Sequence, residues 1–211
     1  VPQKASHEVQ ALSADDARKL IEAAQDSRIE ALLILAVTTG MRRGELLGLR
    51  WDDIDLEQRV LHIRRTMNWI AGFGFIENDP KTKASRRRVT LPLVAVEALK
   101  KHRFRQDQAK QQAGTKWIEK GLVFPNTVGN FLGPGHLLTM FHKVLDQAGL
   151  PHMRFHDLRH SAATILLTMG VHPKVVQELL GHSSITMTMD TYSHLLPSMQ
   201  KEAMDGMDNL F

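Results

Sequence analysis

The chain has 211 residues and no cysteine, and its 27 Lys and Arg residues against 23 Asp and Glu residues give a net charge of +4. The absence of cysteine excludes a disulfide framework, a cysteine nucleophile and any zinc or iron–sulfur site held by thiolates. The longest apolar run, Ala31 to Val37, is far shorter than the ~20 residues that cross a bilayer, so we expect a cytoplasmic protein without a membrane span.

The first segment, residues 1–11, has the composition of a connector. Because the chain opens with Val1, we interpret this segment as a linker from a missing upstream domain. The Ser-x-x-acid pattern from Ser13 to Asp16 then predicts the start of a helix, since the serine hydroxyl can accept from a free backbone N–H group.

A second helix, nearly buried, is predicted by the apolar residues between Ile29 and Val37, and Gly40 is placed to end it. The segment from Met41 to Leu47 has the pattern of the first turn of another helix. Arg42 is therefore expected at the junction between two helices.

Short apolar runs separated by turn residues predict a small antiparallel sheet of three strands. The runs are Val60 to Ile63, Phe73 to Ile76 and Val89 to Leu91. The charged segment from Asn78 to Arg88 is predicted as a hairpin loop that leads into the last strand and carries Lys81.

The rest of the chain is predicted to be helical. One helix begins at Pro92, three others end at Gly149, Gly170 and Gly181, and a last apolar stripe runs from Leu196 to Leu210. The expected fold class is α+β, a mainly helical domain with a small antiparallel three-stranded sheet at one edge.

The chain contains a single tyrosine, Tyr192. In the absence of cysteine a nucleophile must be a hydroxyl, an amine, a carboxylate or an imidazole. A tyrosine packed on a helix with its hydroxyl satisfied is the commoner arrangement, and for Tyr192 alone it is the simpler interpretation.

A cluster of histidines and an arginine is predicted on one helix face, because His156, Arg159 and His160 are three and four residues apart. With His152 they could suggest a metal site. No HExxH pattern accompanies them, however, and an arginine on the same face would repel a cation. An anion site fits these residues better.

Arg42 could bind the same anion, because its place at a helix start brings a guanidinium and backbone N–H groups together. Glu45, one turn later, could orient Arg42, or the two could form an ordinary surface ion pair. Lys81 and Lys83 could likewise belong to a solvated run of charge.

The order of these motifs resembles the catalytic domain of the tyrosine recombinase, or phage integrase, family, over a span from Leu12 to Tyr192. The matching segments are Thr39–Trp51, Pro80–Lys83, His156–His160, Leu180–Ser183 and Thr191–Tyr192. The catalytic pattern of that family is filled at every position, by Arg42, Lys81, His156, Arg159, His182 and Tyr192.

The resemblance implies cleavage of a DNA phosphodiester by Tyr192. Arg42 and Arg159 would clamp the nonbridging oxygens, because a planar guanidinium fork matches them better than an ammonium does. The reference pKa of tyrosine is about 10, so Tyr192 needs help to ionise, and His156 is the best candidate for the general base.

The resemblance also implies a role for a lysine and a second histidine. Lys81 would protonate the leaving 5′-oxygen, although a slip of two residues in the hairpin would give Lys83 this role. His182 would donate a hydrogen bond to a nonbridging oxygen. The product would be a 3′-phosphotyrosyl enzyme and a free 5′-hydroxyl, with no ATP, metal or other cofactor.

The expected partner is double-stranded DNA, held mostly by phosphate contacts that weaken with salt. Beyond the catalytic set, the candidate contacts are Arg43, Lys83, Arg86, Arg87 and Arg88. Residues 12–194 would form the catalytic domain, and residues 195–211 a tail that docks either on a neighbouring protomer or on its own domain.

The family resemblance further implies a tetramer in the recombination synapse, accessory DNA-bending proteins and association with the nucleoid. Two other functions remain open. A type IB topoisomerase uses a related set of tyrosine and arginines, and a noncatalytic module could bind DNA or a metal through its histidines.

Overall fold

The structure is a computed structural model. It describes residues 11–78, 86–182 and 184–186, and, near the C-terminus, 200–201, 204–205 and 207–208. Lys81, Lys83 and Tyr192, together with most of the predicted tail, lie outside the described residues. No helix within the described ranges is long and apolar enough to cross a membrane.

The first helices begin and end close to the predicted positions. Helix α1 (Ala14–Ala23) is capped by Ser13, whose side chain accepts a hydrogen bond from the backbone N–H of Asp16. Helix α2 (Glu30–Thr39) is buried along most of its length and ends at Gly40, which has a left-handed φ of 63°. Helix α3 (Arg43–Leu47) follows directly.

The strands form two small sheets. Strands β1 (Ile54–Asp55), β2 (Val60–Ile63) and β5 (Arg87–Thr90) form an antiparallel three-stranded sheet in the order β1-β2-β5. Strands β3 (Thr66–Ile70) and β4 (Gly74–Asn78) pair separately as a hairpin. The α+β class with a three-stranded sheet is confirmed, and two of the predicted strands, β2 and β5, belong to that sheet. The third strand is β1 and not the run from Phe73 to Ile76, so the predicted hairpin that joins this run to the last strand was wrong.

From Gly74 onward, the run from Phe73 to Ile76 pairs with β3, a strand that the sequence pattern did not reveal. Trp69 lies opposite Phe75 in this hairpin, and their rings meet edge to face with centroids 4.8 Å apart. Residues 66–69 do alternate polar and apolar side chains, but three of the five β3 residues are exposed and only Met67 is buried.

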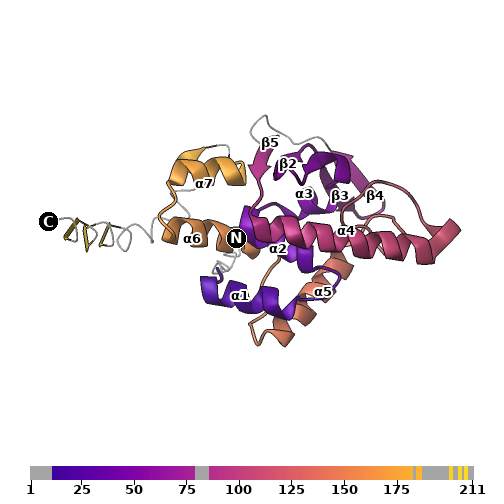
Figure 1. The fold of residues 1–211 in the computed structure, drawn as a ribbon, viewed down its shortest axis with the longest axis horizontal. Helices are drawn as coiled ribbons and strands as arrows, with labels where there is room; N and C mark the ends of the chain where they lie inside the picture. Colours follow the sequence, from indigo (N-terminus) through magenta and orange to yellow (C-terminus); the bar gives the residue numbers. More distant parts are fainter. Residues whose placement is uncertain are drawn as a thin grey trace, which may run out of the picture.

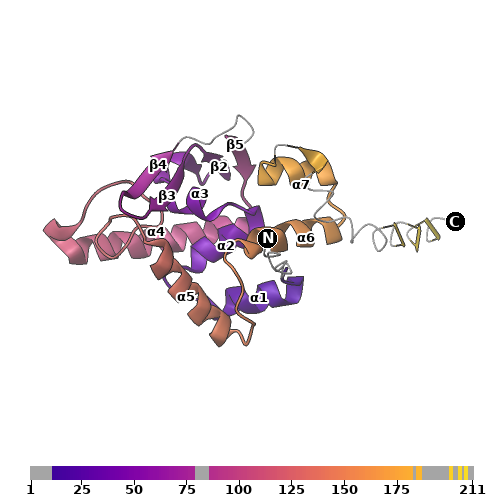
Figure 2. The same cartoon turned by 180° about the vertical axis from the view of Figure 1, so that it is seen from behind.

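Helix α2 packs between two later helices, α4 and α6, and so forms the centre of the domain. In the opposite views of Figures 1 and 2, the strands lie above α4 and α7 lies above α6, while α1 and α5 lie below α4. The later helices are α4 (Leu93–Ala113), α5 (Pro134–Gln147), α6 (Asp157–Thr168) and α7 (Pro173–Leu180), with short 3-10 helices η1 (Trp51–Asp53) and η3 (Gly114–Lys116).

Helix α7 is held partly by a hydrophobic cluster separate from the main core. The cluster consists of Ala163 and Leu167 from α6 with Val176 and Leu180 from α7. At its far end α7 approaches α2 so closely that a Cβ atom on Gly40 would lie 2.3 Å from the Cδ2 atom of Leu180. The docking of α7 therefore depends on a glycine at position 40.

We expect Gly40→Ala to lower the free energy of unfolding by about 2 to 4 kcal/mol, because it combines left-handed strain with overpacking against Leu180. Urea unfolding monitored by circular dichroism measures this loss. Gly135→Ala is the matched control, since nothing lies within 4 Å of a Cβ at that position. Equal stability of the two variants would contradict the close approach of α7.

Candidate active site

Arg42 lies at the start of α3, where Glu45 holds it by two contacts. Its backbone N–H donates to Oε2 of Glu45 at 2.9 Å, and Nη1 donates to Oε1 at 2.9 Å. Its Nη2 donates to the carbonyl oxygen of Gly181, just beyond α7, at 3.3 Å. The side chain is still 37% exposed, so part of the guanidinium is open to a ligand.

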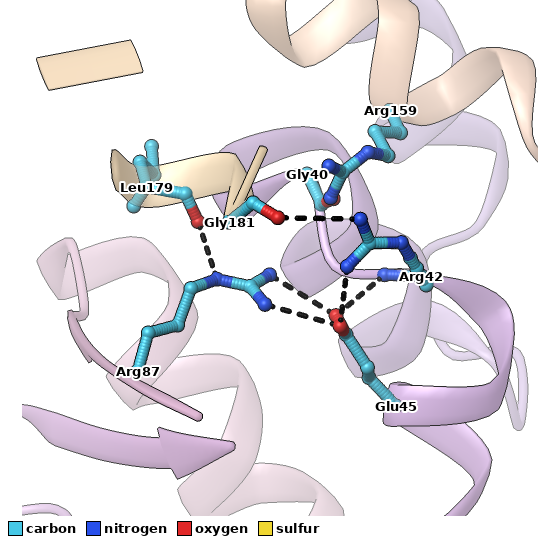
Figure 3. A network of polar contacts seen from close by, with 7 residues as sticks. All are labelled: Gly40, Arg42, Glu45, Arg87, Arg159, Leu179 and Gly181. Atoms are coloured by element: carbon cyan, nitrogen blue, oxygen red, sulfur yellow. Dashed lines mark hydrogen bonds and ion pairs between the residues drawn. The ribbon is translucent and has the colours of Figure 1, made fainter. Parts of the chain in front are cut away.

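Glu45 is buried between two arginines (Figure 3). Arg87, on β5, donates Nη1 to Oε1 and Nη2 to Oε2 of Glu45, each at 3.0 Å. Burial raises the pKa of the Glu45 carboxyl, but the hydrogen bonds and charges of Arg87 and Arg42 outweigh it and hold the pKa below its usual range. Glu45 is therefore a buried carboxylate anion, not a surface partner of Arg42.

The placement of Arg87 differs from what a phosphate contact at the protein surface would require. Its side chain is only 7% exposed, and its Nε donates to the carbonyl oxygen of Leu179 at 2.6 Å. Arg86 and Arg88, the neighbouring residues, are exposed, as is Arg43. The guanidinium of Arg87 is used inside the protein, while the side chains of the other three arginines are accessible from solvent.

Arg159 projects from the first turns of α6 into the interior. It is 4% exposed, and its Nη1 donates to the carbonyl oxygen of Gly40 at 2.8 Å. Figure 3 shows its guanidinium beside that of Arg42. The fold thus brings together two arginines that are more than a hundred residues apart in the sequence.

His156 and His160 share the α6 face with Arg159, as predicted. Their rings meet edge to face with centroids 5.3 Å apart. Burial lowers the pKa of both rings; for His156, the charges of His160 and Arg159 lower it further. His156 is therefore neutral near pH 7 and able to accept a proton.

His152 does not join this pair in a metal site. Its ring stacks on His142 with centroids 4.4 Å apart, and its Nε2 lies 2.8 Å from Oδ1 of Asp146. Within the described part of the chain, no group of three histidines and carboxylates is arranged to hold a metal ion.

His182 follows Gly181, the left-handed residue that ends α7. Its backbone N–H donates to the carbonyl oxygen of Gln177 at 3.1 Å, and its own carbonyl accepts from the side chain of Gln177. Burial, followed by the charges of Arg159 and Arg42, lowers the pKa of the His182 ring to about 4. The ring is neutral at pH 7 and can donate one hydrogen bond.

This low pKa predicts a pH dependence of stability. As the pH falls below about 6.5, the unfolded chain binds a proton at His182, whereas the folded chain binds it only near pH 4. The free energy of unfolding should therefore fall across this window, with His156 and His160 acting in the same direction. The measurement is the free energy of unfolding in urea from about pH 7.5 to about pH 4. We expect its slope against pH to be smaller in His182→Gln, by an amount that corresponds to at most one bound proton. An unchanged slope would contradict the burial of the ring.

Two hollows extend from these residues. A groove of about 970 Å³ has Arg42, Arg43 and His156 among its lining residues and continues along α5 and the β3–β4 hairpin. A second, of about 550 Å³, is lined largely by basic residues, His62, Arg64, Arg65, Arg86, Arg87 and Arg88, with Ile63 and Glu77. Sequence analysis missed Arg64 and Arg65, although they directly follow a predicted strand.

Comparison with known proteins identifies the family of this chain. A sequence model described as "Phage integrase family" matches residues 10–199. The chain belongs to the phage integrase family. Among its family relatives, a tyrosine recombinase XerC-like protein of Caldanaerobacter subterraneus subsp. tengcongensis is 39% identical over 99% of this chain and 56% of its own length. An integrase of Saccharopolyspora erythraea is 28% identical over 100% of the chain and 60% of its own length. The chain thus spans little more than half the length of these curated relatives.

Solved structures share the fold of this chain. The Tn1549 transposon integrase in complex with transposon right end DNA aligns with a TM-score of 0.80 at 23% identity, covering 97% of this chain and 68% of that one. The XerA recombinase aligns with a TM-score of 0.70 at 28% identity, covering 93% and 64%. The first likeness shows the fold alone.

Proposed function

We propose that this chain is the catalytic domain of a site-specific DNA recombinase that cleaves and rejoins strands through a 3′-phosphotyrosyl intermediate. The observation that carries the proposal is the convergence of Arg42, Arg159, His156 and His182. These residues come from three separate segments, and the pKa values of both histidines are lowered by both arginines. Membership of the phage integrase family supports the same function.

The charges of the site suit a pentacovalent phosphate. Arg42 and Arg159 supply positive charge for the nonbridging oxygens, and His182, neutral at pH 7, donates a further hydrogen bond. His156, also neutral, is the general base candidate. Lys81, or Lys83 two residues later, is the general acid candidate and Tyr192 the nucleophile, both assigned from the sequence.

The proposed reaction exchanges one phosphodiester for another. The phenol oxygen of Tyr192 attacks phosphorus and gives its proton to His156, while the bond from phosphorus to the 5′-oxygen breaks and that oxygen takes a proton from the lysine. A 5′-hydroxyl of another strand then reverses these steps. Because each step replaces one phosphoester bond with another, rejoining consumes no ATP.

Phosphate contacts around this site would provide most of the DNA affinity. Arg43, Arg86 and Arg88 are exposed, and Arg64 and Arg65 line the same basic hollow as the last two. Lys83 is a further contact proposed from the sequence. Similar solved structures include a XerH recombinase bound to its difH substrate and a lambda integrase dimer bound to a core site. Double-stranded DNA is accordingly the proposed substrate.

The assembly around the catalytic domain follows from the same proposal. We further propose that residues 12–194 form the catalytic domain, with residues 1–11 as a linker from an upstream DNA-binding domain and residues 195–211 as a tail that docks either on a neighbouring protomer or on its own domain. We also propose a tetrameric synapse, accessory DNA-bending proteins and association with the nucleoid.

Nicked duplexes of randomised sequence provide the test, because cleavage near a nick releases a short fragment and traps the covalent adduct. In the presence of a chelator, the 211-residue chain should form a detergent-stable adduct, and sequencing of the trapped DNA should return one preferred site. Trapping of all sequences alike, with relaxation of supercoiled DNA, would instead indicate a type IB topoisomerase. No adduct, with DNA binding that requires added zinc, would indicate a noncatalytic module.

A further inference from the structure

Arg87 connects three segments that are far apart in the sequence. From β5 its two Nη atoms reach the two carboxylate oxygens of Glu45 on α3, and its Nε reaches the carbonyl of Leu179 near the end of α7. Figure 3 shows the planar guanidinium between these partners. A lysine could not reproduce this contact, because an ammonium is a single point of charge without a planar fork.

The carboxylate that Arg87 binds is the same one that holds Arg42. Oε1 of Glu45 accepts from Nη1 of both arginines, and Oε2 accepts from Nη2 of Arg87 and from the backbone N–H of Arg42. Two guanidinium charges thus face one buried carboxylate charge. The balance of this group is one positive charge, and Arg42 is the member with an exposed side chain.

The end of α7 is tied to the same group. Leu179 and Gly181 present carbonyl oxygens to Arg87 and Arg42 respectively, and such carbonyls at a helix end have no partner within the helix. His182 follows directly. Apart from the small hydrophobic cluster of α6 and α7, these polar contacts tie the end of α7, next to His182, to α3 and β5.

We propose that Arg87 is a positioning residue of the recombinase site: it neutralises Glu45 so that the charge of Arg42 remains available to the scissile phosphate, and it holds the end of α7 in place. This inference rests on the proposed function, and it assigns to Arg87 no contact with DNA. Without Arg87, the carboxylate of Glu45 would be paired with Arg42 alone, and the positive charge offered to the phosphate would be cancelled.

The test uses Arg87→Met and the double variant Arg87→Met/Glu45→Gln, with single-turnover cleavage of the duplex selected above. At saturating DNA we expect Arg87→Met to cleave about 10²-fold more slowly, with the half-saturating DNA concentration changed less than about twofold. Removing the carboxylate charge should restore part of the rate, so the double variant should cleave at least about fivefold faster than Arg87→Met. A merely structural arginine would give a double variant as slow as the single one or slower, and that result overturns the proposal.

Two further variants keep the result decisive. Arg18→Met is the matched control, because it also removes one arginine charge, from a side chain 73% exposed on α1. It should cleave like the wild type. If Arg87→Met does not fold, Arg87→Lys takes its place. The double variant Arg87→Lys/Glu45→Gln must then cleave DNA faster than Arg87→Lys. A loss of DNA affinity alone, with an unchanged rate at saturation, would make Arg87 a DNA contact and overturn the proposal.

Binding of inorganic phosphate separates this inference from the proposed function. Titration followed by the NMR signal of the His182 ring requires no cleavage. Arg87→Met should weaken phosphate binding severalfold, and the double variant Arg87→Met/Glu45→Gln should bind phosphate more tightly than Arg87→Met. If the wild type forms no DNA adduct, the proposed function fails, while this titration still decides the role of Arg87; unchanged phosphate affinity in Arg87→Met overturns it.

Discussion

Replacement of Tyr192 by phenylalanine is expected to eliminate the covalent DNA adduct. Tyr192 is the only tyrosine in the chain, and there is no cysteine, so the substitution removes the one phenol and leaves no thiol to substitute for it. Phenylalanine keeps the ring and removes only the hydroxyl oxygen, which is the atom proposed to attack phosphorus. DNA binding and stability should therefore stay close to those of the wild type.

The measurement is the amount of protein that remains attached to labelled DNA after denaturation in detergent. Ser193→Ala is the matched control, because it removes a neighbouring hydroxyl and should leave the adduct intact. Adduct that persists in Tyr192→Phe, or disappears in Ser193→Ala, would assign the nucleophile to another residue.

Helix ends were the part of the fold best predicted from the sequence. Ser13, Gly40 and Gly181 all lie where the sequence placed them, because capping by a serine hydroxyl and left-handed backbone at glycine depend on local chemistry. The junction at Arg42 followed from the same reasoning. Local signals were sufficient to place the residues that border the site.

Contacts between segments that are distant in the sequence were harder to predict. The hairpin of β3 and β4 was missed because its stability comes from ring contacts, among them Phe75 with Phe131, 56 residues further on, with centroids 5.1 Å apart. Arg87 illustrates the opposite case. Strand alternation places it on the same face as the buried Val89, so the period of two could have separated it from the exposed Arg86 and Arg88.

The two arginines of the proposed clamp differ in burial. A solvent-facing anion site would contribute little to the core, so its arginines could be truncated with folding nearly intact. Arg42 is partly exposed, in agreement with that view, but Arg159 is buried and donates to the buried carbonyl of Gly40. The two clamp arginines are thus expected to differ in what they contribute to stability.

We therefore expect Arg159→Ala to reduce both cleavage and stability. Loss of one guanidinium from the proposed clamp should slow cleavage by at least about 10² to 10³-fold. The Gly40 carbonyl would also lose its charged donor in a buried position, which should lower the free energy of unfolding by about 1 to 3 kcal/mol. Single-turnover cleavage and urea unfolding, both below the melting temperature of the variant, measure the two effects.

Arg42→Ala is the matched comparison, since it should slow cleavage to a similar degree with a smaller loss of stability. Its carboxylate partner Glu45 keeps both hydrogen bonds from Arg87, and Arg42 is the more exposed arginine. If Arg159→Ala were as stable as the wild type, the contact with Gly40 would contribute nothing to the fold. If it cleaved DNA at the wild-type rate, Arg159 would not belong to the proposed clamp. It would then serve only to hold α6 against the end of α2.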